Sequence, residues 1–219
     1  MEILAFADFH GNQDAYRKAN EIIAKVKPRL VLVVGDIFNR DSNEAKARLT
    51  EFARKGAPVY FVPGNMDGAE LSNWDGVEKV HQLHGRCVYA EGVALIGLGG
   101  APHGPFKTVF EYSENEGAQL LEQASKEYHG GKLILLSHCP PKDTKLDIVP
   151  SGDHAGSEAV RSFVEKKQPV LVLSGHVHES QGIDMIGSTT LVNVGPAQNH
   201  NYAHVTLEDE VRVRFAKFP

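Results

Sequence analysis

Polar side chains follow directly after five apolar segments of this 219-residue sequence. Each segment has the length and composition of a buried strand, and the polar residues that follow are carboxylates, imidazoles and one amide. They are Asp8, His10, Asp36, Asn65, His138, His176 and His178. These ligand types suit divalent ions such as Mn, Fe, Ni or Zn. A carboxylate at the end of a buried strand needs a cationic partner. Because Arg40 is the only basic residue soon after Asp36, we expect metal ions at these strand ends.

The elements around these residues alternate between strand and helix. Residues 1–36 read as strand, helix and strand, from two short apolar runs and the helical spacing of apolar residues between them. This unit implies parallel strands, and ligands bind beyond the carboxyl ends of strands in such sheets. Because side chains two apart in an extended chain point the same way, Asp8 with His10, and His176 with His178, are expected to face one centre each.

The rest of the chain continues this alternation and adds short strands. The expected elements are strands at 58–62, 77–80, 87–90, 93–98, 133–136 and 170–173, helices at 42–55, 113–129 and 157–167, and three or four short strands within 183–215. Glycines separate the strands between 77 and 98 with no long helix among them, which predicts antiparallel pairing at a sheet edge or in a second sheet. One α/β domain over residues 1–219, with two mixed sheets, accounts for this order.

Composition and charge exclude several classes of protein. The formal net charge is −5, which disfavours an extended nucleic-acid surface because such a surface clusters Lys and Arg. No apolar run approaches the ~18 residues of a membrane span, and the acidic start of the chain does not resemble a signal peptide. Two cysteines, Cys87 and Cys139, define no disulfide framework. We therefore predict a cytoplasmic protein without a membrane partner, and its oligomeric state stays open, a homodimer included.

The spaced polar set resembles the calcineurin-like metallophosphoesterases. The family's motifs appear in order as Asp8-Phe9-His10, Gly35-Asp36, Gly64-Asn65-Met66-Asp67, Ser137-His138 and Gly175-His176-Val177-His178. The loop from Phe106 to Glu116 and the residues after His176 are most similar to small prokaryotic phosphoesterases related to a cyclic-nucleotide phosphodiesterase. The resemblance implies a four-layer αββα sandwich of two mixed β-sheets flanked by helices.

The resemblance also implies which residues hold two divalent transition-metal ions. One ion would be bound by Asp8, His10, Asp36 and His178, and the other by Asp36, Asn65, His138 and His176. In such sites a hydroxide that bridges the ions attacks a phosphoryl group in line. The implied function is a di-metal phosphoesterase that hydrolyses phosphodiesters or phosphomonoesters, with a small, nucleotide-type phosphate ester as substrate. The alternatives are a non-catalytic protein-binding scaffold of the same fold and a nuclease. The complete ligand set disfavours the scaffold, and the negative charge disfavours the nuclease.

One position departs from the family pattern. The family often has a histidine after the Gly-Asn pair, where this sequence has Met66, and a thioether cannot donate a proton to a leaving group. We therefore expect diesters or activated esters, which need less proton assistance. His154 is the first candidate for the vacant role, because it precedes a helix whose N-terminus offers N–H groups to a phosphate, and His103 is the second. Asp67 is predicted to be structural, as the cap of a short helix at 69–73.

Overall fold

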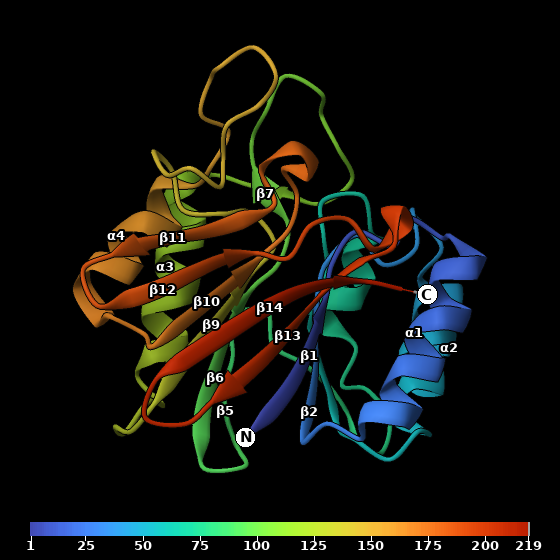
Figure 1. The fold of residues 1–219 in the computed structure, drawn as a ribbon. Coiled ribbons are helices and arrows are strands. Elements are labelled where there is room, and N and C mark those ends of the chain that lie inside the picture. The colour runs from blue at the N-terminus through green and yellow to red at the C-terminus, as the bar shows by residue number, and fades with distance from the viewer. Residues whose placement is uncertain (219) are drawn as a thin grey trace.

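Two six-stranded sheets pack face to face between two pairs of helices in the computed structural model, which describes residues 1–218 (Figure 1). The helices α1 (Gln13–Val26) and α2 (Ser42–Ala53) cover one sheet, and α3 (Glu114–Ser125) and α4 (Glu158–Lys167) cover the other. The predicted αββα sandwich with two mixed sheets is confirmed.

The first sheet has a parallel centre and an antiparallel edge. Its order is β14-β13-β1-β2-β3-β4. These strands are β1 (Glu2–Phe6), β2 (Leu30–Val34), β3 (Val59–Val62), β4 (Val80–Gln82), β13 (Asn201–Leu207) and β14 (Val211–Lys217). The strands β1 to β4 run parallel to one another, and β13 joins β1 antiparallel. Every residue of β2 is buried, as expected for a continuous apolar run inside a covered sheet.

The second sheet repeats this plan. Its order is β11-β12-β10-β9-β6-β5. These strands are β5 (Cys87–Ala90), β6 (Val93–Leu98), β9 (Leu133–Ser137), β10 (Leu171–Ser174), β11 (Gly182–Ile186) and β12 (Thr189–Asn193). The central four are parallel, while the edge strands β5 and β11 are antiparallel to their neighbours. A two-stranded ribbon, β7 (Ala101–Pro102) with β8 (Glu111–Tyr112), follows β6.

Three apolar layers hold the sandwich together. One lies between α1, α2 and the first sheet, one lies between the two sheets, and one lies between the second sheet and α3, α4. Asn12 caps α1 by accepting a hydrogen bond from the Ala15 N–H, and Ser113 and Glu116 form a capping box on α3. No helix within residues 1–218 has both the length and the apolar character needed to cross a membrane.

Two predicted elements differ in the structure. The strand expected at 77–80 lies at Val80–Gln82 instead, and it pairs parallel with β3 rather than antiparallel. Val77 is 47% exposed, so the apolar residue that suggested the earlier start does not enter the core. The helix expected to reach residue 129 ends at Ser125, and a turn follows it through Tyr128.

The carboxyl ends of the central strands meet at one rim of the sandwich. The Asp8 N–H donates to the Gly35 carbonyl at 3.0 Å, and the Gly175 N–H donates to the His138 carbonyl at 3.1 Å, so neighbouring strand ends are tied within each sheet. His138 Nδ1 lies 2.8 Å from the Val34 carbonyl oxygen, which joins the two sheets. Two loops, residues 103–110 and 145–156, project beyond this rim at the top of Figure 1 (green and golden).

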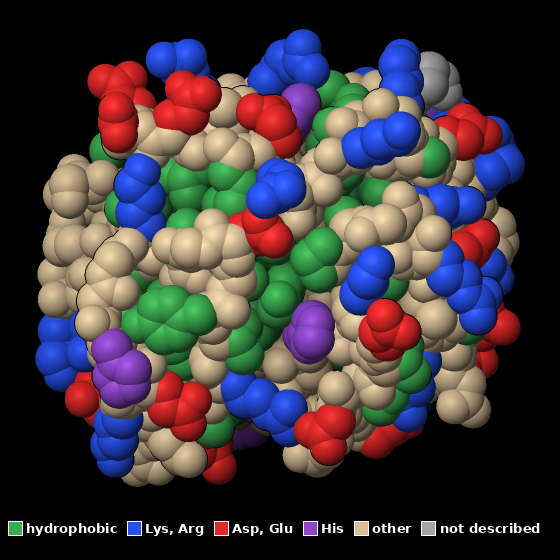
Figure 2. Space-filling view, turned by 90° about the horizontal axis from the view of Figure 1, so that it is seen from below, with side chains coloured by type: hydrophobic (Ala, Val, Ile, Leu, Met, Phe, Trp, Pro, Cys, Tyr) green, Lys and Arg blue, Asp and Glu red, His purple; other side chains and the backbone are tan. Residues whose placement is uncertain are grey.

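The opposite face carries no broad basic area. Figure 2 shows the molecule from below, where Lys and Arg side chains alternate with Asp and Glu side chains around apolar patches. On this face, basic and acidic side chains thus lie interspersed.

Candidate active site

The strand-end rim brings together all seven residues predicted as metal ligands. Asp8, Asp36, Asn65 and His138 are buried there, and His10, His176 and His178 are partly exposed. Two groups within the rim have the spacing of a metal site. One is Asp8 with His10 and His178, and the other is Asp8 with Asp36 and His138, each with ligand atoms within 4.8 Å of one another. Residues far apart in sequence therefore meet in groups that could hold a metal ion.

One half of the rim is built from the ends of β1 and β10. His10 Nε2 lies 3.3 Å from His178 Nε2. His178 Nε2 lies 3.6 Å from Asp8 Oδ1, and His10 Nε2 lies 3.5 Å from Asp36 Oδ2. Two imidazole nitrogens that face each other beside two carboxylates form a donor set that a divalent cation matches.

The other half of the rim centres on Asn65, after β3. Its Oδ1 atom lies 2.9 Å from His138 Nε2 and 2.9 Å from His176 Nδ1. His138 Nε2 is also 3.6 Å from Asp36 Oδ1. Asp36 thus directs one carboxylate oxygen toward each half, which is the arrangement expected of a ligand shared by two ions.

The backbone at these residues is unusual. Asp8, His10, Asp36 and His176 all have positive φ, at 55°, 46°, 49° and 67°. Non-glycine residues seldom adopt this left-handed conformation, and such strain gathers at functional sites. Asp8 and His10 do face one centre, as expected, but not because the chain is extended. The expectation that His176 and His178 face one centre was wrong, because His178 lies beside His10 and His176 lies beside Asn65. Tight turns at the strand ends aim these side chains.

Hydrogen bonds behind the rim fix the orientation of two imidazoles. His138 Nδ1 donates to the Val34 carbonyl, and His10 Nδ1 lies 2.8 Å from Asn39 Oδ1. Because Nδ1 carries the proton in each ring, Nε2 presents its lone pair to the rim, as in metal-binding histidines generally. Asn39 was missed by the sequence analysis. No sequence pattern indicates that Asn39 contacts His10, because loop residues after the Gly-Asp motif follow no regular spacing.

The two buried carboxylates of the rim lack a Lys or Arg partner among the described residues. No Lys or Arg nitrogen lies within 4.0 Å of the Asp8 or Asp36 carboxylates anywhere in residues 1–218. Burial raises the pKa of Asp36, and it acts the same way on Asp8. There the contact with His178 and the charges of the nearby imidazoles outweigh burial and hold the pKa of Asp8 below its usual value. Burial lowers the pKa of His176 to about 3, so this ring is neutral at pH 7. Two buried carboxylates among imidazoles therefore fit divalent cations.

Asp67 supports the rim from behind. Its fully buried carboxylate accepts hydrogen bonds from the backbone N–H groups of Ile37, Phe38 and Gly64, at 3.1, 2.9 and 2.8 Å. It therefore joins the loops after β2 and β3. The predicted cap of a short helix is wrong, because the 3-10 helix Ala69–Asn73 has no side-chain cap. Burial, followed by the charge of Asp36, raises the pKa of Asp67 to about 6.

Met66 supports the rim through backbone hydrogen bonds rather than through its side chain. The Met66 N–H donates to Asp36 Oδ1 at 2.8 Å, and the Met66 carbonyl accepts from the Arg40 N–H at 2.9 Å. The residue after Asn65 thus helps to hold the shared carboxylate in place, and it adds no group able to transfer a proton.

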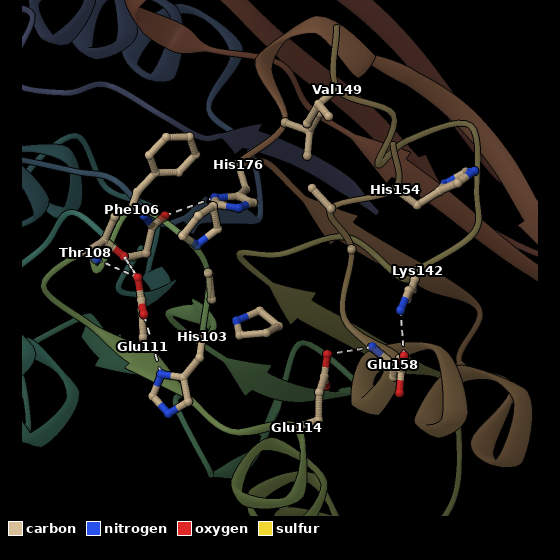
Figure 3. A pocket seen from close by; sticks show the side chains of 18 of the residues that line it. His103, Phe106, Thr108, Glu111, Glu114, Lys142, Val149, His154, Glu158 and His176 are labelled. Carbon is tan, nitrogen blue, oxygen red and sulfur yellow. Dashed lines mark hydrogen bonds and ion pairs between the residues drawn. The ribbon is translucent and has the colours of Figure 1, made fainter. Parts of the chain in front are cut away.

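A cavity of about 740 Å³ opens from the rim at Asn65 and His176. The two projecting loops form its walls, and Figure 3 shows the side chains that line it. His103 and His154 both belong to this lining. In Figure 3 their rings point away from His176, and no hydrogen bond or ion pair within the described chain joins either ring to the seven-residue rim.

His154 is attached to a carboxylate that the sequence analysis missed. His154 Nδ1 lies 2.7 Å from Asp147 Oδ1, and Asp147 is fully buried. The same carboxylate accepts from the N–H groups of Thr144 and Gly156, at 2.9 and 3.0 Å. The hydrogen bond with Asp147 raises the pKa of His154. His154 is therefore one of several groups in this loop that hydrogen-bond to Asp147. Its role as proton donor stays a prediction.

The helix N-terminus next to His154 is already occupied. Glu114 accepts hydrogen bonds from the Glu158 and Ala159 N–H groups at 2.9 and 2.8 Å, and Ser157 accepts from the Val160 N–H. The expected phosphate site at this end of α4 is therefore wrong, because a side-chain carboxylate already holds the N–H groups that a phosphate would need.

Comparison with known proteins agrees with this geometry. Residues 1–180 match the calcineurin-like phosphoesterase family. An uncharacterised protein of Methanocaldococcus jannaschii is 30% identical over 204 residues, which cover 90% of this chain and 88% of that protein. A protein of Arcobacter nitrofigilis, named as a probable glycerophosphodiester phosphodiesterase, is 29% identical over 177 residues, 77% of this chain and 61% of its own length.

A solved structure shows the same fold. The structure of the protein TT1561 of Thermus thermophilus has a TM-score of 0.80 at 19% identity, over 100% of this chain and 99% of that one. At this identity the likeness concerns the fold alone. The family match over residues 1–180 means that the chain belongs to the calcineurin-like phosphoesterase family.

Proposed function

We propose that this chain is a metal-dependent phosphoesterase that binds two divalent ions and hydrolyses phosphodiesters in preference to phosphomonoesters. The observation that carries the proposal is the pair of buried carboxylates, Asp8 and Asp36, which converge with four imidazoles and have no Lys or Arg partner within residues 1–218.

Each residue of the rim has a defined part in this proposal. Asp8, His10 and His178 would hold one ion, Asn65, His138 and His176 would hold the other, and Asp36 would contact both. The ions, when bound, would polarise phosphoryl oxygens and acidify a water molecule. Asn39 and the Val34 carbonyl keep the His10 and His138 rings turned toward the rim.

The lack of a proton donor beside the rim supports diesters or activated esters as substrates. His103 and His154 point away from the rim, and Met66 cannot donate a proton. A leaving group that departs as a stable anion needs no such donor. The name of the Arcobacter relative, a probable glycerophosphodiester phosphodiesterase, is in keeping with diester substrates. We also propose the narrower placement beside small prokaryotic relatives of a cyclic-nucleotide phosphodiesterase, and a cytoplasmic location.

Two other functions are less well supported. A non-catalytic scaffold has no need of a complete ligand set, whereas here all seven side chains converge. A nuclease needs a basic surface to neutralise phosphates, whereas the net charge is −5 and Lys142 is the only Lys or Arg in the described cavity lining.

Activity measured over a panel of metals tests the proposal. The protein would be loaded in turn with Mn, Fe, Ni, Zn and Mg, and assayed with bis(p-nitrophenyl) phosphate and p-nitrophenyl phosphate. We expect turnover with at least one metal, faster with the diester, and its loss in Asp36→Asn. Asp209→Asn, at an exposed turn, serves as the matched control and should behave as wild type. A protein that binds two ions per chain yet hydrolyses neither ester would contradict the proposal.

A further inference from the structure

The loop between β7 and β8 presents a large apolar side chain to solvent at the mouth of the cavity. Phe106 is 86% exposed and lines the cavity. Figure 3 places Phe106 and Val149, which come from the two projecting loops, on either side of His176. An aromatic ring gains nothing from exposure to water. At the mouth of the cavity, Phe106 therefore offers an apolar contact surface to an occupant of the cavity.

The loop that carries Phe106 is tied to the rim. Glu111 Oε1 accepts a hydrogen bond from the Thr108 hydroxyl at 2.7 Å. The Phe110 N–H donates to the Asn65 carbonyl at 3.0 Å, and the His103 N–H donates to the Tyr112 carbonyl at 2.9 Å. Because Asn65 is itself part of the rim, these hydrogen bonds attach the loop that carries Phe106 to it.

Hydrogen bonds also hold the loop that carries Val149 in place. The Val149 N–H donates to the Asp153 carbonyl at 3.0 Å, and the Ser180 hydroxyl donates to the Ile148 carbonyl at 2.6 Å. Asp147 joins both ends of the loop through the bonds described above. The cavity therefore has two fixed walls, with apolar side chains at Phe106 and Val149 and prolines at 102 and 105.

The Lys and His side chains of the cavity walls already contact carboxylates. Lys142 Nζ lies 2.6 Å from Glu158 Oε1, His103 bonds Glu111, and His154 bonds Asp147. Lys142 is the only Lys or Arg side chain in the described lining, and it thus has a carboxylate partner. A ligand with a second anionic group would meet no unpaired cation, and it would meet the exposed carboxylate of Glu179. The cavity suits an uncharged, apolar group.

We propose that Phe106 determines specificity by contacting an aromatic group on the phosphate ester, between Phe106 and Val149. The inference rests on the proposed function, since it takes the phosphate to lie at the rim. The substrates would be phosphate esters that carry an aromatic group and no second negative charge. Aromatic pairs gain free energy beyond the area they bury, which favours an aromatic occupant over an aliphatic one.

Binding of phosphonates, which the enzyme cannot hydrolyse, tests this proposal by calorimetry on the manganese-loaded protein. Phenylphosphonate should bind about tenfold more tightly than methylphosphonate, as an aromatic contact of ~1.4 kcal/mol provides. Phe106→Ala should remove that preference while methylphosphonate affinity stays unchanged. 4-Carboxyphenylphosphonate should bind more weakly than phenylphosphonate. Tyr89→Ala, an exposed aromatic residue outside the cavity lining, is the matched control and should keep the preference.

The outcomes separate this inference from the proposed function. Equal affinities for the phenyl and methyl compounds, or a preference that survives in Phe106→Ala, would overturn the aromatic subsite even if the enzyme hydrolyses phosphate esters. Absence of hydrolysis with the phenyl preference intact would overturn the proposed function and leave the subsite in place. Because Phe106 is exposed, its removal should not alter the melting temperature.

Discussion

The rim at the strand ends and the cavity walls above it are built on different principles. The rim residues are mostly buried, and four of its seven have a strained backbone. The walls are loops, held together by side-chain carboxylates such as Asp147 and Glu111. The rim concentrates charge that the protein does not balance, whereas the Lys and His side chains along the walls contact carboxylates. The rim thus suits metal ions, and the walls suit an uncharged group.

This difference separates the part of the site that depends on the fold from the part that depends on the loop sequences. The rim depends on the sandwich, because five strand ends must meet before its residues can converge. The walls depend on loop residues that the fold does not constrain. Changes at the rim should therefore remove function outright, and changes in the walls should alter which substrate is used.

The largest effect is expected at Asp36, because one oxygen of its carboxylate faces each half of the rim. Asp36→Ala should reduce the content of both metals and lower activity by more than ~100-fold, beyond the loss usual for residues behind a metal site. His10→Ala should mainly affect one ion. Metal analysis by mass spectrometry measures this. Equal metal content in Asp36→Ala and wild type would show that the carboxylate is not shared.

A smaller loss is expected from Asn39, which touches the rim only through His10. Asn39→Ala leaves the His10 ring free to rotate, so the affinity for metal should fall by about 10- to 100-fold. Titration with a competing chelator provides the measurement. Asn43→Ala, on the exposed side of α2, is the control and should change nothing. An unchanged affinity in Asn39→Ala would mean that packing alone orients His10.

Most of the rim was predictable from sequence, because strand-end position and residue type both carry information. The apolar runs before Asp8, Asp36 and His138 specify buried strands, and parallel strands end at the same edge. What the sequence could not show is which hydrogen bonds orient the rim. Asn39 and Asp67 act through loops, and the target predicted for Asp67 was wrong because two of its true partners lie 30 and 29 residues earlier in the chain.

The walls were far less predictable for a related reason. His154 was chosen for its place before a helix, yet that helix end is occupied by Glu114, more than forty residues away in sequence. Asp147, the centre of the same loop, carried no pattern at all. Local rules describe strands and helix caps, whereas a loop wall depends on contacts between distant segments.

Two glycine substitutions test whether the rim tolerates an added β-carbon less well than the wall does. A β-carbon at Gly35 would collide with the His138 ring, and the residue has a φ of +84°. Gly35→Ala should therefore destabilise the protein by about 3 kcal/mol, from overpacking together with backbone strain. Gly104, in the wall, has an ordinary φ and open space around it, so Gly104→Ala should stay within ~0.5 kcal/mol of wild type. Urea unfolding of both variants would reveal whether the rim tolerates less change.

The smallest effect concerns His84, at the base of the wall that carries Phe106. Its Nδ1 accepts a hydrogen bond from the Gly99 N–H at 2.9 Å, and its ring packs against Phe110 at 5.0 Å between centroids. Burial lowers the pKa of His84 to about 4, against 6.5 for the free side chain. Between these values the unfolded chain binds the proton and the folded chain does not, so stability is lost as the pH falls.

For His84 the loss amounts to about 2 kcal/mol between pH 7 and pH 5. His84→Gln, which cannot titrate, should lack this part of the pH dependence when unfolding is followed in the presence of a chelator. The chelator separates the titration of the wall from any protons that metal binding displaces at the rim. If wild type and His84→Gln lose stability in parallel, the sensitivity to acid belongs to rim groups such as His176, whose pKa burial also lowers, and not to the wall.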